Sequence, residues 1–197
     1  PHIAGVVDEL AVVRSCWVDG VNHVGGVCQM NTGSILAGRP SMGAWVTYGL
    51  GSENQDLPAF VVMTDAGEPV GGPRNWGNGW LPATFQGTSF RGEGPPILHL
   101  AAPQGIPESR QRAKLALIEN LDRAHAAARA YDTRLSARIA AYELAYRMQS
   151  QAPEAVELSG ESRETQALYG MNDSRCREFA AMCLRARRLV ERGVRFV

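Results

Sequence analysis

Three side chains with metal-binding or proton-transfer chemistry lie close together early in the chain. Asp19, Asn22 and His23 fall within five residues, and Gly25 and Gly26 follow. A carboxylate and an imidazole can bind a metal ion or move protons. A helix that begins here would present free N–H groups to a phosphate, sulfate or carboxylate, and the two glycines would let it approach the backbone. The structural alternative is a turn at Asp19 followed by a capping or hydrogen-bonded loop histidine.

A second polar group occupies residues 31–34 and 39–43. The planar guanidinium of Arg39 can hold two oxygens of a sulfate or phosphate at once. In the alternative interpretation, Arg39 ends a helix and either faces solvent or pairs with a carboxylate. The residue types alone slightly favour this alternative.

Two tryptophans stand close together in the stretch from Asn75 to Trp80. An indole stacks on the apolar face of a sugar, so Trp76 and Trp80 are candidates for carbohydrate binding. The alternative is a loop that its tryptophans anchor to the core. His99 and His125 are expected to be structural or exposed.

The arginines near the C-terminus are expected to lie on one helix, with Glu178 and Glu191 nearby; they are Arg185, Arg187, Arg188 and Arg192. This pattern indicates a solvated face or a subunit contact. Basic and aromatic residues do not alternate here, and the net charge is zero, so no nucleic-acid partner is expected. No apolar run approaches the roughly 20 residues of a membrane span.

The apolar pattern predicts short strands, some of them in a buried parallel sheet. These strands are expected at residues 11–16, 58–63 and 97–100, with a terminal strand beginning at Val194. Residues 66–96 are rich in glycine, proline and tryptophan, which predicts a long irregular loop.

Helical spacing and capping residues predict the remaining elements. A short helix is expected to end near Leu10, and longer helices are expected over 24–37, 41–50 with Ser41 as cap, 107–130, 135–149, and from a cap at Asp173 to Gly193. Alternation of helices and β segments favours an α/β fold with a mainly parallel sheet.

The composition divides the chain into two halves. Residues 1–100 hold 17 of the 21 glycines and all four tryptophans, whereas residues 101–197 hold 16 of the 20 basic residues. We therefore expect a strand- and loop-rich half with the site, followed by a helical half. The four cysteines show no zinc-binding or disulfide spacing and are expected to be small buried residues.

Long segments of the chain resemble a large bacterial family of sulfatase-like proteins, domain of unknown function 1501. The resemblance is carried by residues 30–63 (MNTGSILAGRPSMGAWVTYGLGSENQDLPAFVVM), 137–149 (ARIAAYELAYRMQ) with 152–154 (APE), and 183–197 (CLRARRLVERGVRFV). It implies the alkaline phosphatase and sulfatase superfamily, whose fold is an α/β/α sandwich around a mostly parallel sheet. The family also implies export to the periplasm.

The resemblance implies hydrolysis of sulfate or phosphate esters, on small molecules or polysaccharides, by a metal-supported nucleophile at a helix N-terminus. Placing the family's Thr-Gly pair on Thr32 and Gly33 puts His23 at the nucleophile position, where the Cys-x-Pro-x-Arg element of sulfatases is missing. On this reading His23 and Asn22 are catalytic, Asp19 and His23 bind a divalent metal (Ca, Zn or Mg), and Arg39 and Thr32 bind substrate.

The departures from the family pattern leave two expectations about the chain. The superfamily's Asp-His-His metal cluster is not in residues 1–197, so we expect these residues to be the central part of one sulfatase-like domain, inactive by itself. The alternative is a non-catalytic carbohydrate-binding or structural protein that kept the fold and lost the nucleophile.

Overall fold

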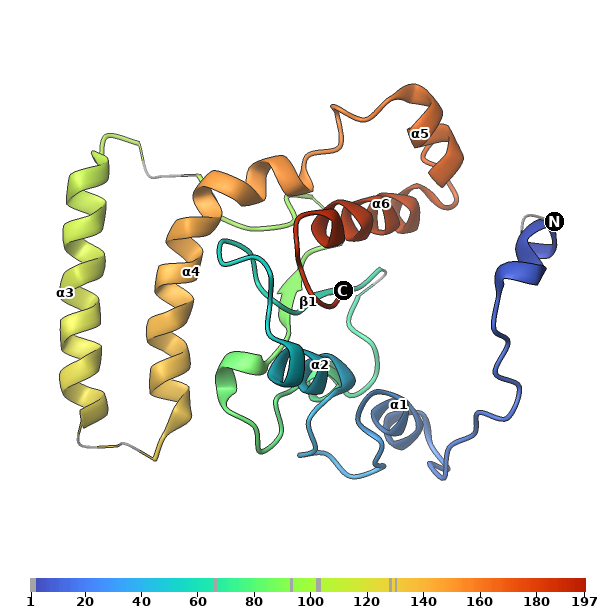
Figure 1. Cartoon of the computed structure of the whole chain (residues 1–197), viewed down its shortest axis with the longest axis horizontal. Helices are drawn as coiled ribbons and strands as arrows, with labels where there is room; N and C mark the ends of the chain where they lie inside the picture. Colours follow the sequence, from blue (N-terminus) through green and yellow to red (C-terminus); the bar gives the residue numbers. More distant parts are fainter. Residues whose placement is uncertain (1–2, 66, 93, 102–103, 128, 130) are drawn as a thin grey trace.

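A computed structural model describes residues 3–65, 67–92, 94–101, 104–127, 129 and 131–197. Helices dominate it, and Figure 1 shows them arranged around a small central sheet. In chain order the elements are η1 (Ile3–Glu9), α1 (His23–Thr32), α2 (Met42–Leu50), β1 (Val61–Met63), η2 (Gly72–Trp76), η3 (Ala83–Phe85), β2 (Thr88–Phe90), α3 (Glu108–Ala127), α4 (Thr133–Val156), α5 (Arg163–Tyr169) and α6 (Arg177–Glu191).

The sheet pairs β1 with β2 in parallel, with Val61 opposite Thr88. Phe196 adds a parallel bridge to Phe60, which brings the C-terminal residues beside the start of β1. The predicted strand at 58–63 is therefore confirmed over Val61–Met63, with Phe60 in a bridge just before it, and its parallel pairing is confirmed. The mixture of helix and strand agrees with the expected α/β class, but the described sheet has only these two strands and does not show an α/β/α sandwich.

The main core lies where α4 and α6 pack beside the sheet. Val61 of β1 and Leu189 of α6 are fully buried, and Phe90 of β2 is 2% exposed. Two small residues of α4, Ala152 and Ala155, are also fully buried. Their lack of long side chains lets α4 pack closely against α6, where the Nε of Arg188 donates to the carbonyl of Ala155.

Local capping signals set the ends of the first two long helices. The Oγ of Ser41 accepts a hydrogen bond from the N–H of Ala44, so the predicted cap of α2 is confirmed. The predicted helix over 24–37 is too long at its C-terminal end, because α1 stops at Thr32. Gly33 there has φ of 73°, and its N–H donates to the carbonyl of Gln29.

The long helices α3 and α4 form a hairpin (Figure 1). The start of α3 at Glu108, just after Pro107, matches the prediction, whereas the predicted end at Ala130 lies outside the described residues. α4 continues through Pro153, well beyond the predicted end at Gln149, and bends near its C-terminal end. Within the described chain, no helix combines the length and apolar character needed to cross a bilayer.

Two predicted strands are wrong. Residues 11–16 are exposed and irregular, because no described strand lies beside them to pair with and bury their apolar side chains. Residues 97–100 form bends and turns, while β2 lies in the stretch predicted as an irregular loop. β2 has two exposed residues and one buried one, so it lacks the apolar run that predicts a strand.

The C-terminal half contains one further correction and one unpredicted helix. Asp173 does not cap α6, which begins only after Cys176; instead its carboxylate accepts from the N–H and guanidinium of Arg175. α5 was not predicted and is capped by Ser162. The predicted stop at Gly193 is confirmed, since its φ of 83° suits glycine.

The burial predicted for the cysteines holds for only one of them. Cys28 is buried and Cys183 is intermediate, but Cys16 and Cys176 are exposed. Cys16 is exposed because the segment around it forms no sheet. All four are free thiols.

Candidate functional site

The N-terminus of α1 carries the residues first singled out for chemistry. The Oδ1 of Asn22 accepts a hydrogen bond from the N–H of Gly25 at 2.9 Å, so Asn22 is the N-cap of the helix. His23 is the first helical residue, and its side chain is exposed. The alternative in which His23 caps the helix or lies in a loop is therefore wrong, because Asn22 is the cap and His23 is helical. The imidazole of His23 is accessible at the positive end of the helix dipole.

Asp19 is held against α1 by Gln29, a residue of that helix ten positions further along the chain. The Nε2 of Gln29 donates to the Oδ2 of Asp19 at 2.9 Å, and the N–H of Asp19 donates to the Oε1 of Gln29 at 2.7 Å. Gly20 lies against the helix so closely that a Cβ there would be 2.4 Å from the nitrogen of Gly26. The loop before α1 is therefore closed onto the helix, and one Asp19 oxygen is already occupied.

Thr32 lies at the other end of the same helix. Nine residues separate it from His23, which corresponds to about 13.5 Å along the axis at 1.5 Å per residue. Its hydroxyl donates to the carbonyl of Cys28 at 2.8 Å. The structure thus does not bring Thr32 together with His23, and the Thr32 hydroxyl satisfies the helix backbone.

Arg39 lies beside an exposed indole. Its Cζ is 6.0 Å from the centroid of the Trp80 ring, a cation–π distance. Among the described residues no carboxylate pairs with Arg39, so its charge is available to an anion. Gly79 packs against the backbone before Pro40, where an added Cβ would be only 2.3 Å from the Pro40 nitrogen. This close approach positions Trp80 next to Arg39.

Trp80 begins a row of aromatic side chains on the surface. Successive rings meet edge to face: Trp80 with Trp45 at 6.2 Å, Trp45 with Tyr48 at 6.2 Å, and Tyr48 with Phe85 at 5.2 Å. Trp80, Trp45 and Tyr48 are 62%, 46% and 53% exposed. We call these four residues the aromatic row. Trp45 and Tyr48 were not predicted as site residues, although their three-residue spacing on a helix places them on one face.

The two tryptophans of the predicted sugar-binding stretch have different environments. Trp76 is 5% exposed, and its carbonyl accepts a hydrogen bond from the N–H of Gly87. Asn75 is equally buried, and its Nδ2 donates to the carbonyl of Val70. Trp76 therefore anchors its loop and cannot stack on a sugar, whereas Trp80 can.

The arginines of α6 mostly pair with carboxylates inside the chain. Arg187 lies 2.9 Å from Glu161, Arg188 also pairs with Glu161, and Arg192 lies 3.0 Å from Glu154. These bonds to the two guanidinium groups lower the pKa of Glu161, with the Arg188 bond contributing most. The cluster thus joins α6 to α4 and to the turn before α5. Of its four arginines, 185, 187, 188 and 192, only Arg185 has no salt bridge to a described residue.

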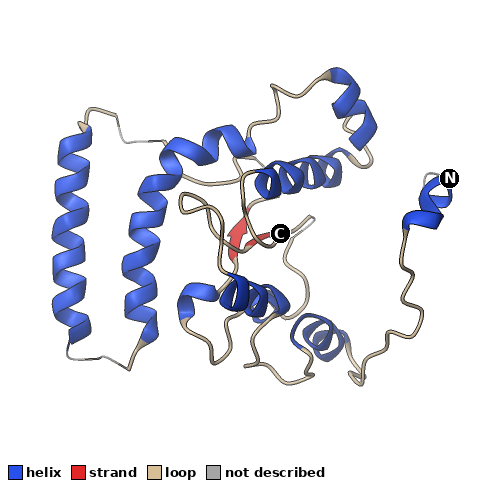
Figure 2. Ribbon diagram, in the orientation of Figure 1, coloured by secondary structure: helices blue, strands red, loops and turns tan. Residues whose placement is uncertain are grey.

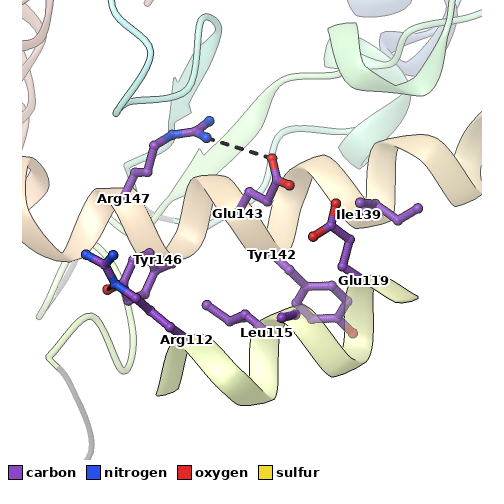
Figure 3. Close-up of a pocket in the computed structure, with 9 residues that line it drawn as sticks. Arg112, Leu115, Glu119, Ile139, Tyr142, Glu143, Tyr146 and Arg147 are labelled. Atoms are coloured by element: carbon purple, nitrogen blue, oxygen red, sulfur yellow. Dashed lines mark hydrogen bonds and ion pairs between the residues drawn. The ribbon is translucent and has the colours of Figure 1, made fainter. Parts of the chain in front are cut away.

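A small slot of about 270 Å³ lies between α3 and α4 (Figure 3). The hydroxyl of Tyr146 accepts from the Nε of Arg112 at 2.9 Å and donates to Glu108 at 2.9 Å. The Tyr146 bond, followed by the Arg112 bond, lowers the pKa of Glu108. Arg112, Tyr146 and Glu108 satisfy one another, so the slot is a gap in the packing of two helices, and these three groups offer no free reactive pair.

No cluster of three or more metal-binding side chains is found among the residues that the structure describes. Of the predicted metal ligands, His23 is exposed and Asp19 retains one oxygen without a bond to Gln29. Two such groups do not complete a site for Ca, Zn or Mg.

Comparison with known proteins gives one match. A family model described as "Protein of unknown function (DUF1501)" matches residues 1–197. No curated protein and no solved structure matches the chain.

Proposed function

The chain belongs to the DUF1501 family, and from that membership we propose that the full-length protein is a sulfatase-like hydrolase of sulfate or phosphate esters carried by carbohydrates. The observation that carries the proposal is Arg39, which pairs with no described carboxylate, beside the exposed ring of Trp80. The resemblance of residues 30–63 to sulfatase-like proteins supports the reaction type.

Arg39 and Trp80 suit the two parts of such a substrate. The guanidinium binds two oxygens of a sulfate or phosphate group, which neutralises the charge of the ester. The indole face stacks on the apolar face of the sugar that carries this group. The aromatic row continues from Trp80 across α2, which would hold neighbouring sugar rings of a longer chain.

His23 is proposed as the group that moves a proton or attacks the ester. In hydrolysis, water cleaves the S–O or P–O bond, and the leaving alkoxide must receive a proton. An exposed imidazole can give that proton. Asp19 would need to exchange its bond with Gln29 for another partner before it could assist.

A divalent metal is part of the proposal only for the full-length protein. The described residues do not form a complete metal site, as noted above, so any such ion would need ligands beyond Asp19 and His23. We therefore assign no step of the reaction to a metal.

The proposal is tested by assaying the full-length protein with aryl sulfates and aryl phosphates in the presence of divalent metals. We expect His23→Ala to lower kcat by at least tenfold and Arg39→Ala to raise KM by at least tenfold, since a charge-assisted hydrogen bond contributes about 1.5–3 kcal/mol. Arg14→Ala, on the exposed N-terminal segment, is the matched control. Turnover that neither site variant changes would remove both residues from the mechanism.

The second candidate function is carbohydrate binding without catalysis. It is favoured by the aromatic row, whose tryptophan and tyrosine rings are exposed without any role in the core. Titration with neutral and sulfated oligosaccharides tests it: Trp80→Ala should weaken binding at least tenfold. Trp17→Ala, which removes another exposed indole, should not. Binding without turnover by the full-length protein would favour this function over hydrolysis.

A further inference from the structure

An open cleft of about 1170 Å³ lies outside the candidate site described above. Its walls are formed by residues 92, 94–97 and 99–101, by the C-terminal end of α4 with the two residues after it, and by the first half of α6. The lining is mainly apolar, with contributions from Pro96, Ile97, Leu100, Val156, Leu158 and Met171. A cleft of this size and character can enclose most of a small apolar molecule.

Two arginines line this cleft. Arg177 donates its Nε to the carbonyl of Met171 at 3.0 Å, whereas Arg185 is less well satisfied. Its Nε donates to the carbonyl of Val156 at 3.4 Å, which is a long and weak bond. Its Nη1 is sealed from solvent and has no hydrogen-bond partner among the described residues. Burial lowers the pKa of Arg185. A partly desolvated cation without a counter-ion is unfavourable by itself, so an anion bound here would be strongly favoured.

The carboxylates that line the cleft are mostly engaged elsewhere. Glu154 pairs with Arg192 at 3.0 Å. The Oε1 of Glu157 accepts from the N–H of Ser159 at 2.9 Å, and Glu157 exerts only a secondary Coulombic effect on Arg185. Glu178 is exposed, in the first turn of α6. These acidic groups would repel a multiply charged ligand, which favours an anion with a single charge.

The backbone at the rim of the cleft is strained at a second lining residue. His99 has φ of 52°, and it is the only described non-glycine residue with a positive φ. Such conformations are uncommon outside glycine and cluster at ligand-binding segments. The strained rim and the unsatisfied cation thus occur in the same cleft.

We propose that this cleft binds a small amphipathic monocarboxylate. The carboxylate meets the guanidinium of Arg185, and the aliphatic body lies along Pro96, Ile97 and Leu100. The inference does not depend on the ester hydrolysis proposed above, because it uses none of the same residues.

Calorimetric titration of the full chain with decanoate, below its micelle concentration, tests the proposal. Decanoate should bind with one-to-one stoichiometry, and decan-1-ol, which lacks the charge, at least tenfold more weakly. Arg185→Met keeps the apolar volume and removes the charge, so it should reduce decanoate affinity at least tenfold. Its melting temperature should equal or exceed that of the wild type, because the unpaired charge is gone. Arg110→Met, on the exposed face of α3, is the control and should bind as the wild type does.

Three results would overturn the proposal. The first is decanoate affinity that Arg185→Met leaves unchanged, and the second is decyl sulfate binding as tightly as decanoate. The third concerns Glu93, which lies in the sequence between the lining residues Gly92 and Gly94 and outside the described residues. If Glu93→Gln binds decanoate and the wild type does not, the carboxylate of Glu93 occupies the position beside Arg185 that the proposal assigns to the ligand.

Discussion

Asp19 and Gln29 are joined by two reciprocal hydrogen bonds across a ten-residue separation, one through the Asp19 backbone and one through its carboxylate. The pair closes the loop before α1 onto the first turns of that helix. It therefore decides both the shape of the loop that precedes His23 and how much of the Asp19 carboxylate is free for chemistry.

Removing Gln29 should loosen this loop. We expect Gln29→Ala to lower the free energy of unfolding by about 1 kcal/mol, since each exchanged hydrogen bond contributes roughly 0.5–1.5 kcal/mol and both lie at the surface. Urea denaturation measures the change. Gln151→Ala, on an exposed position of α4, is the control and should change stability by less than about 0.5 kcal/mol. Equal effects of the two variants would show that the Asp19–Gln29 pair adds no stability.

Gly79 and Gly33 allow a matched test of close packing. Both have positive φ, 56° and 73°, but a Cβ at Gly79 would be 2.3 Å from the Pro40 nitrogen, whereas a Cβ at Gly33 would meet nothing within 4 Å. Gly33→Ala should cost about 1–2 kcal/mol of stability from the backbone conformation alone. Gly79→Ala should cost clearly more and should also change the fluorescence of Trp80. If thermal melts give the same loss for both, the close approach to Pro40 does not constrain the chain.

Glu161 should make stability depend on pH. Its bonds with Arg188 and then Arg187 lower its pKa below the ordinary value of 4.5. A carboxyl group with a lower pKa in the folded state stabilises that state above its unfolded pKa, and the contribution is lost as pH falls through the folded value. Glu161→Gln should therefore melt below the wild type near neutral pH, and the difference should shrink as pH falls below 4.5.

Thermal melts between about pH 7 and pH 3 measure this difference. The control places Glu161→Gln in a chain that already carries Arg187→Met and Arg188→Met, where the pH-dependent difference should disappear. A difference that stays constant across the pH range would contradict the ion-pair origin of the effect.

Tyr146 should hold the N-terminal end of α3 against α4. Its hydroxyl bonds with both Arg112 and Glu108, and these contacts are supplemented by the bond between Gln111 and Gln149. Tyr146→Phe should speed amide hydrogen exchange in the first turns of α3 with little change in the global melting temperature, because α3 contributes little to the main core. Tyr131→Phe, whose ring is 88% exposed, is the control. Unchanged exchange in α3 would show that the hydroxyl is not needed.

The thiols should react in the order of their exposure. Cys16 and Cys176 are exposed and should be alkylated by a maleimide in the native protein, whereas the buried Cys28 should react only after unfolding. Mass spectrometry of peptides from native and urea-treated protein measures this. Native labelling of Cys28 as fast as that of Cys16 would contradict the packing of α1.

The elements that sequence reasoning located well are those with strong local signals. Ser41 predicts the start of α2, the β-branched run around Val61 predicts β1, and Gly193 predicts the end of α6; all three are found in the structure. Caps, β-branched runs and left-handed glycines act within a few residues, so the neighbouring sequence is enough to specify them.

The sequence-based predictions are wrong where the formation of a strand, or the burial of a side chain, depends on residues distant in the sequence. Residues 11–16 have the composition of a buried strand but find no described strand to pair with, while β2 forms with little apolar character because β1 lies beside it. The same holds for Trp76 and Trp80, which are four residues apart and have opposite burial.

By itself, then, the sequence determined the family, the helix boundaries at strong caps, the first parallel strand and the set of polar groups available for chemistry. Only the tertiary structure decided which of these groups are free. Gln29 occupies Asp19, the helix backbone takes the Thr32 hydroxyl, and no described carboxylate reaches Arg39. The reason is physical: whether a polar group is paired depends on partners brought near by folding, and residue type and spacing do not specify those partners.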